Sequence, residues 1–161
     1  MKVEQLMRRD VKMCGARETL NRAAQLMWEN DCGCLPVVGD DGQAVGMVTD
    51  RDVCMAAYTQ GGPLSGLCVP SAMARGVRAC RPTDTIEAAE RIMRAAQVRR
   101  LPVIDAEGRI VGLLSLNDIA REVARERSSA KGRREAGGEA LAGTLATIST
   151  PRECRDVAVA L

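Results

Sequence analysis

The sequence predicts an α/β (α+β) protein in which two β-α-β-β-α repeats pack as a pseudo-two-fold pair, followed by a short C-terminal tail. Three observations support this: an ungapped internal duplication, the same alternation of helical and strand patterns in both copies, and an apolar composition that requires an aliphatic core. The chain has 161 residues, 46% of them apolar and 27% charged, as in globular domains. It has no His or Phe, and its only aromatic residues are Trp28 and Tyr58.

The duplication is visible in a motif that begins each predicted hairpin. Leu35-Pro36-Val37-Val38 recurs 66 residues later as Leu101-Pro102-Val103-Ile104. The same offset aligns identical residues before and after this motif, including Val3/Val69, Met7/Met73, Cys14/Cys80, Thr19/Thr85, Met27/Met93, Gly42/Gly108, Gly46/Gly112 and Asp52/Asp118. We therefore expect repeat one at about residues 3–60, a linker at 61–68 and repeat two at 69–126.

Each repeat is expected to begin with a short extended segment, at residues 11–14 and 77–80, that leads into a helix. In repeat two, Asp84 and Glu87 have the spacing of a capping box, which predicts the helix start. Apolar residues then recur at helical spacing: Leu20, Ala23, Ala24 and Met27 in repeat one, and Ile86, Ala89 and Met93 in repeat two.

Two apolar runs follow in each repeat and predict a β-hairpin. Residues 35–38 and 44–48 are separated by Asp40-Asp41-Gly42, and residues 101–104 and 110–114 by Glu107-Gly108. A second helix is expected at about residues 50–59 and 116–127. One such unit is too small to cover both faces of its sheet, so we expect the two copies to pack sheet against sheet.

The tail, residues 127–161, is predicted to be a flexible linker with a possible short helix. Residues 121–135 carry six basic and three acidic residues, and Gly137-Gly138 interrupts helical periodicity. Leu141, Leu145 and Ile148 then have the spacing of a short amphipathic helix. This apolar stripe could pack on the repeats, on a second subunit or on a partner, or the helix could be frayed.

The composition excludes most catalytic machineries. Without His there is no Ser-His-Asp triad, no imidazole base and no His-ligated zinc or haem. With 1% aromatic residues there is no row of stacking platforms for single-stranded nucleic acid. A net charge of +2 is too balanced for nucleic-acid or membrane binding driven by the charge of the whole protein. Contact of the basic stretch at residues 121–135 with nucleic acid is the weaker alternative. No apolar run spans a membrane and no signal peptide is present, so we expect a cytoplasmic protein.

The cysteines are expected to be free thiols, because their number is odd and a cytoplasmic location is predicted. Cys32-Gly33-Cys34 is the only close pair. A metal or redox site there is the weaker alternative, because the sequence has neither a second pair nor a histidine. The seven cysteines are Cys14, Cys32, Cys34, Cys54, Cys68, Cys80 and Cys154.

The second strand of each predicted hairpin leads into a shared motif of Gly, two apolar residues, Thr or Ser, any two residues, and Asp. It reads Gly46-Met47-Val48-Thr49-Asp50-Arg51-Asp52 in repeat one and Gly112-Leu113-Leu114-Ser115-Leu116-Asn117-Asp118 in repeat two. Together with the Leu-Pro-Val motif and the β-α-β-β-α order, this resembles the CBS domain (cystathionine-β-synthase-type) family. Two copies in tandem over residues 3–126 are similar to a Bateman module in a stand-alone small CBS-domain protein.

The chemistry of this motif suits a nucleotide. A carboxylate such as Asp52 or Asp118 can accept hydrogen bonds from both hydroxyls of a ribose. The Thr49 or Ser115 hydroxyl can reach a ribose or phosphate oxygen, and the helix N-terminus favours an anion. Gly46 and Gly112 would let a base approach the backbone. The alternative is that both motifs are ordinary capping boxes, a role that ligand binding does not exclude.

The resemblance also implies which residues face each motif. Asp52 and Thr49 would share a site with Arg99 and Arg100, whose guanidiniums suit a phosphate. The alternative is two solvated arginines.

Asp118 and Ser115 would instead face Cys32-Gly33-Cys34, which has no basic group. That second site would take a less charged adenosyl ligand, bind weakly or stay empty. The adenine would pack among apolar residues beside Cys14 and Cys80, which as small hydrophobes also fit a core.

The function that the resemblance implies is a regulatory binding module without a covalent cofactor. It would sense AMP, ADP, ATP or S-adenosylmethionine in clefts between the repeats and signal to an effector protein through a homodimer, which in this family is commonly a flat disc. A ligand-free structural or interaction scaffold is the alternative. An enzyme, including a thiol-based redox protein, has the least support, because no histidine base or converging carboxylates are present and a redox thiol would need a depressed pKa.

Overall fold

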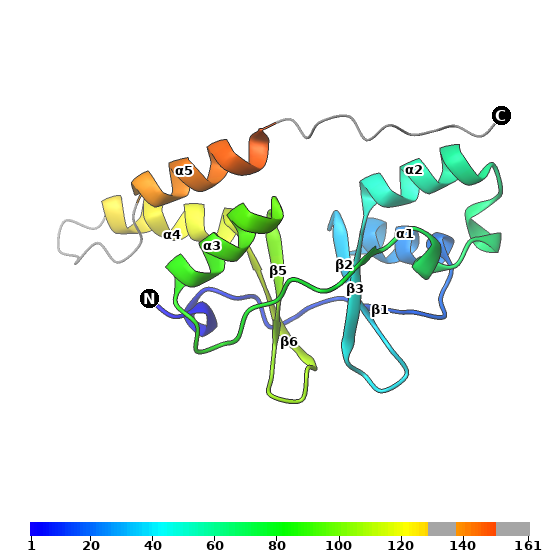
Figure 1. Cartoon of the computed structure of the whole chain (residues 1–161), viewed down its shortest axis with the longest axis horizontal. Coiled ribbons are helices and arrows are strands. Elements are labelled where there is room, and N and C mark those ends of the chain that lie inside the picture. The colour runs from blue at the N-terminus through cyan, green and yellow to red at the C-terminus, as the bar shows by residue number, and fades with distance from the viewer. Residues whose placement is uncertain (129–137, 151–161) are drawn as a thin grey trace.

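The computed structural model describes residues 1–128 and 138–150 and confirms the predicted α/β fold class. The hairpins and helices lie close to the predicted ranges (Figure 1). Repeat one contains β1 (Cys14–Gly15), α1 (Leu20–Glu29), β2 (Cys34–Val38), β3 (Ala44–Thr49) and α2 (Asp50–Gln60). Repeat two contains β4 (Ala74–Arg75), α3 (Ile86–Ala96), β5 (Arg100–Ile104), β6 (Ile110–Ser115) and α4 (Leu116–Ser128), and α5 (Gly138–Ser149) follows.

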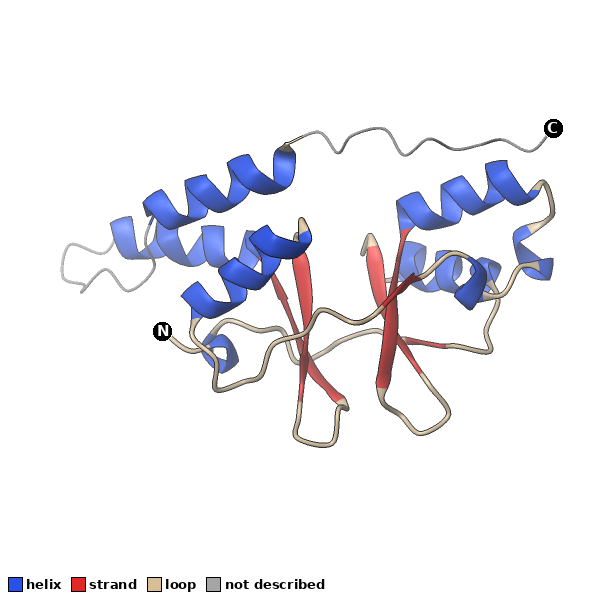
Figure 2. Ribbon diagram, in the orientation of Figure 1, coloured by secondary structure: helices blue, strands red, loops and turns tan. Residues whose placement is uncertain are grey.

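The strands of both repeats lie in the middle of the molecule, and the helices flank them on the outside (Figure 2). The strand order is β1-β2-β3-β4 in one sheet and β5-β6 in the other. The two hairpins meet at an antiparallel bridge between Gln43 and Arg109, which occupy equivalent positions in the two repeats. This bridge therefore marks the pseudo-two-fold axis of the pair.

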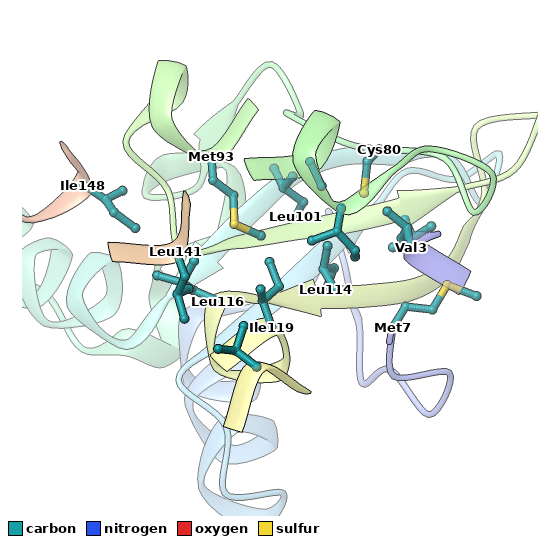
Figure 3. Packing of buried hydrophobic residues seen from close by; sticks show 14 residues of the cluster. Val3, Met7, Cys80, Met93, Leu101, Leu114, Leu116, Ile119, Leu141 and Ile148 are labelled. Carbon is teal, nitrogen blue, oxygen red and sulfur yellow. The ribbon is translucent and has the colours of Figure 1, made fainter. Parts of the chain in front are cut away.

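The repeats exchange their first segments, which the sequence analysis did not predict. Val3 and Met7 pack into the core of repeat two with Leu101 and Leu114 (Figure 3). Val69 packs in the same way into the core of repeat one. The pairing is equivalent on both sides, because Ala74 lies opposite Met47 and Arg8 lies opposite Leu113. Each hydrophobic core is therefore completed by a segment of the other repeat.

Gly46 and Gly112 are explained by this exchange. A Cβ atom on Gly46 would lie 2.7 Å from Met73 Sδ and 2.9 Å from the Ala74 carbonyl oxygen. A Cβ on Gly112 would lie 2.6 Å from Met7 Sδ. The exchanged segments therefore occupy the space that a side chain would need at both glycines.

The first helix of each repeat begins after a threonine. The Thr85 hydroxyl accepts a hydrogen bond from the Ala88 amide at 3.2 Å, as the Thr19 hydroxyl does from the Arg22 amide. The predicted capping box of Asp84 and Glu87 is therefore wrong. The Asp84 carboxylate instead accepts from the Arg81 amide at 2.7 Å and closes the turn before the helix.

The extended segments before these helices are shorter than predicted. β1 has two residues, and in repeat two Cys80 forms a single parallel bridge to Val103. The register is nevertheless the same in both repeats, because Cys14 lies opposite Val37.

The tail helix α5 packs against α3 and α4 of repeat two. Leu141 and Ile148 join the core, and Thr144 between them is fully buried. The predicted stripe is wrong at Leu145, which is 45% exposed, because the buried face follows positions 141, 144 and 148. Much of the predicted flexible linker, residues 129–137 and 151–161, lies outside the described residues.

Glu90 on α3 is buried beneath α5 at 3% exposure. Its Oε1 has no hydrogen-bond partner in the described part of the chain. Burial raises the pKa of Glu90, against the opposing effects of Arg94 and of a hydrogen bond with Thr144.

We expect Glu90→Gln to stabilise the fold at alkaline but not at acidic pH. Because the pKa of Glu90 is raised on folding, its contribution is most favourable below the unfolded-state pKa and is lost as pH rises through the folded-state pKa. Thermal unfolding at about pH 4 and about pH 8 checks this, because these two values lie on either side of the ordinary pKa of Glu. Glu87→Gln is the matched control with the opposite sign, because backbone hydrogen bonding lowers the pKa of Glu87. An equal shift of both variants at both pH values would contradict the assignment.

Candidate functional site

Thr49 and Asp52 lie where β3 passes into α2. The Asp52 carboxylate accepts hydrogen bonds at Oδ2 from the Thr49 amide at 2.9 Å and the Thr49 hydroxyl at 2.7 Å. The Thr49 hydroxyl in turn accepts from the Asp52 amide at 3.2 Å. The two residues therefore form a capping box, as the sequence pattern predicts.

Ser115 and Asp118 form the same arrangement where β6 passes into α4. Asp118 Oδ2 accepts from the Ser115 amide at 2.9 Å and from the Ser115 hydroxyl. Its other oxygen, Oδ1, accepts from Arg121 and, at 3.4 Å, from Arg8 Nε of the exchanged segment. Both carboxylate oxygens of Asp118 are thus occupied, and the residue is only 7% exposed.

The two equivalent aspartates, Asp52 and Asp118, therefore differ in whether a carboxylate oxygen is free to accept a hydrogen bond from a ligand. Asp52 is partly exposed, and its Oδ1 has no hydrogen bond within residues 1–128 and 138–150. Asp118 can receive a ligand hydroxyl only if an arginine leaves it. The ion pairs of Asp118 are a feature that the sequence analysis missed. The i, i+3 spacing of Arg121 is a signal that could have indicated one of them.

The strands that carry the remaining predicted site residues begin close together. Cys34 lies opposite Thr49 in the β2–β3 pair, and Arg100 lies opposite Ser115 in the β5–β6 pair. Figure 2 shows the first residues of β2 and β5 facing each other between the repeats. Burial raises the pKa of the Cys34 thiol, and the Arg100 guanidinium opposes this increase, so these two equivalent positions interact across the pair. The site residues of both repeats thus lie near the beginnings of β2 and β5, which form one shared edge between the repeats.

Arg99 and Gly33, each one residue before the start of β5 or β2, accept backbone hydrogen bonds from the first residue of the helix that follows each hairpin. Arg99 is exposed, and its carbonyl accepts from the Leu116 amide at 2.9 Å. The Gly33 carbonyl accepts equivalently from the Asp50 amide at 3.2 Å. In the described part of the chain, no hydrogen bond or ion pair joins Arg99 or Arg100 to Asp52.

Cys14 and Cys80 are each 2% exposed and belong to the two hydrophobic cores. Burial raises the pKa of each thiol to about 12, with a smaller contribution from Glu18 at Cys14 and from Asp84 at Cys80. Their side chains therefore pack in the cores and do not line an open cleft. A thiol with a raised pKa is also a poor nucleophile.

We expect alkylation at neutral pH to spare Cys14 and Cys80. Raising the pKa from 9.0 to about 12 lowers the thiolate fraction roughly 1000-fold. Iodoacetamide labelling followed by peptide mass spectrometry should find the exposed Cys54 and Cys68 modified first. Rapid labelling of Cys14 or Cys80 in the folded protein would support the thiol-based redox alternative.

Within residues 1–128 and 138–150, no group of three or more Cys, Asp or Glu side chains is placed to hold a metal ion. None of the helices in these ranges is long and apolar enough to cross a membrane.

Comparison with known proteins gives a consistent result. The family model of the CBS domain matches residues 3–58 and 69–125. Hypoxic response protein 1 of Mycobacterium tuberculosis (strain ATCC 25618 / H37Rv) is 36% identical over 118 residues, which cover 73% of this chain and 82% of that protein.

Three solved structures are similar over most of their length. Hypoxic Response Protein I with two coordinated zinc ions has a TM-score of 0.69 at 34% identity and covers 75% of this chain and 98% of its own. CBSX2 in complex with AMP has a TM-score of 0.68 at 26% identity, with 78% and 98% covered. The CBS domain pair of MJ0100, in complex with 5′-methylthioadenosine and S-adenosyl-L-methionine, has a TM-score of 0.70 at 20% identity, with 78% and 97% covered.

Proposed function

Because the chain belongs to the CBS domain family and carries two of its domains in tandem, we propose that it is a regulatory module for an adenosyl ligand. The ligand would bind between the repeats, and a homodimer would pass its occupancy to an effector protein. The observation that carries this proposal is the free carboxylate oxygen of Asp52 at the N-terminus of α2. The AMP held by CBSX2 and the S-adenosyl-L-methionine held by MJ0100 support the ligand class.

Asp52 and Thr49 form the primary site in this proposal. Asp52 Oδ1 would accept hydrogen bonds from the ribose hydroxyls, while Oδ2 keeps the helix cap intact. Arg100, which lies at the shared edge, and the exposed Arg99 would bind a phosphate. Because the sequence has only two aromatic residues, Trp28 and Tyr58, aliphatic packing and backbone hydrogen bonds would hold the adenine.

Asp118 and Ser115, facing Cys32-Gly33-Cys34, form the weaker second site. A ligand there would have to displace Arg8 or Arg121 from Asp118. Because Arg8 lies on the exchanged segment, its displacement would change a contact between the repeats. Binding at this site would thereby favour one arrangement of the pair over another.

Isothermal titration calorimetry with AMP, ADP, ATP and S-adenosylmethionine tests the function. We expect saturable binding of at least one of these ligands. If none of the four ligands binds, the proposal is contradicted and a ligand-free scaffold is favoured. The observation that favours the scaffold is that Thr49 with Asp52, and Ser115 with Asp118, already satisfy each other as helix caps.

A further inference from the structure

Helix α5 is fixed to repeat two by a small set of contacts. Its buried residues are Leu141, Thr144 and Ile148, and the helix packs against α3 and α4 (Figures 1 and 3). At the end of α3, Gln97 Nε2 also donates a hydrogen bond to the Thr147 carbonyl oxygen at 3.4 Å. Isolated helices shorter than about 12–15 residues are marginal in water, and α5 has 12 residues. We therefore expect α5 to be helical only while it is seated on repeat two.

The α3 surface beneath α5 differs from its counterpart in repeat one at the position of Glu90. Sixty-six residues earlier on α1, this position is occupied by Ala24, which lines a pocket of about 470 Å³. The covered position in repeat two thus carries a carboxylic acid where the equivalent position in repeat one carries a methyl group. A helix that only closed a hydrophobic core would be served by the alanine, whereas an acid beneath it makes the contact depend on protonation.

The surroundings of Glu90 suit a neutral carboxyl and not an anion. The residue is 3% exposed, and its Oε1 has no hydrogen-bond partner in the described ranges. The Thr144 hydroxyl has a single hydrogen, which it donates to the Ala140 carbonyl oxygen at 2.8 Å. An ionised Glu90 would have to compete for that hydrogen, whereas a protonated Glu90 can donate to the Thr144 oxygen and leave the bond to Ala140 intact. The seated form of α5 therefore favours the neutral acid.

The charged groups near Glu90 do not supply the missing partner. On α3 itself, Arg94 opposes the increase in the pKa of Glu90 and Glu87 adds to it, but burial has the largest effect. On α4, the buried Glu122 pairs with Arg125, which lowers the pKa of Glu122. Among the described residues, Glu90 is thus a buried acid without an ion pair, in contrast to Glu122. The other charged side chains described on β5, α4 and α5 are Arg100, Asp118, Arg121, Glu126 and Glu139.

We propose that α5 is a cover on repeat two whose release is controlled by the proton on the Glu90 carboxyl. With Glu90 neutral, α5 stays seated and closes the α3–α4 face, which includes Met93 and Ile119. When Glu90 loses its proton to the solvent, lifting of α5 allows the carboxylate to become hydrated, which removes the cost of the buried charge. The chain then responds to pH at a place separate from Asp52. The inference therefore does not rest on the proposed function.

The direction of the response follows from the linkage between protonation and release. Burial raises the pKa of Glu90 in the seated form, and release returns this pKa towards its ordinary value. The seated form is therefore most stable below the pKa of the released carboxyl, and this stability is lost as pH rises through the pKa of the seated carboxyl. Because one proton is lost, the equilibrium constant for release increases by up to about tenfold per pH unit between these two pKa values and then levels off.

Hydrogen–deuterium exchange of the full-length chain, measured by peptide mass spectrometry from about pH 5 to about pH 9, tests this inference. After correction for the intrinsic exchange rate, we expect peptides of α5 to lose protection as pH rises, by roughly tenfold or more over the range. Peptides of α1 in the same sample should keep their protection, because the equivalent residue there is Ala24. Glu90→Gln should keep α5 protected throughout, because an amide side chain does not ionise.

Glu87→Gln is the matched control on the same helix. Glu87 lies one turn before Glu90, is exposed, and has a pKa that a backbone hydrogen bond lowers, so it stays ionised over this pH range. We expect α5 in this variant to follow the wild-type profile. A wild type whose α5 protection is constant with pH, a Glu90→Gln variant that keeps the pH dependence, or a parallel loss of protection in α1 would overturn the inference.

Discussion

Asp52→Ala is expected to lower the affinity for AMP at least about 100-fold, because hydrogen bonds to a charged group each contribute roughly 1.5–3 kcal/mol. The same change removes one half of the α2 capping box and should cost about 1 kcal/mol of stability. Calorimetric titration measures the first effect and chemical denaturation the second. The fold should therefore survive while binding is lost.

Asp118→Ala is the matched control for this prediction. Asp118 makes the same cap and also holds Arg8 and Arg121, so its loss should destabilise the chain more than the loss of Asp52. Its effect on the affinity of the primary site should be small. If Asp52→Ala lowers stability and leaves AMP affinity unchanged, Asp52 is a helix cap and no more.

Gly46→Ala is expected to destabilise the fold by about 2–3 kcal/mol, as overpacking does in a well-packed interior. The new methyl group would lie 2.9 Å from the carbonyl oxygen of Ala74, a backbone atom fixed by the pairing of β4 with β3. The methyl would also press on Met73, the residue that the exchanged segment places there. Urea denaturation followed by circular dichroism measures the change.

Gly143→Ala provides the control of opposite sign. Gly143 lies within α5 with no atom near its added Cβ, so alanine should raise stability by up to about 1 kcal/mol. If Gly46→Ala is as harmless as this control, the exchanged segment does not pack on β3 as described.

Much of the fold could be predicted because each repeat carries its own local signals. The helical spacing of Leu20, Ala23 and Met27 and the Gly turns of both hairpins identify elements that the structure contains. The duplication strengthened these predictions, since two divergent copies kept the same pattern. The helix start was misplaced by one residue, because Asp84 and Thr85 are both good capping residues and the turn closed by Asp84 could not be foreseen.

The remaining features depend on contacts between distant segments. Arg8 reaches Asp118 across 110 positions, and no local pattern marks such a pair. The apolar stripe of the tail predicted a buried face but not that repeat two would bury it. The exchange of the first segments was equally hidden, because Val3 and Val69 would look the same if each packed on its own repeat.

Native mass spectrometry of the wild type and Asp52→Ala, each purified without added nucleotide and then incubated with AMP, tests whether Asp52 holds an adenosyl ligand. We expect the wild-type chain to gain the mass of a bound adenosyl ligand, either carried through purification or taken up from solution. We expect no such gain for Asp52→Ala. A wild-type chain that never carries this mass, or an Asp52→Ala chain that carries it equally, would show that Asp52 does not bind the ligand.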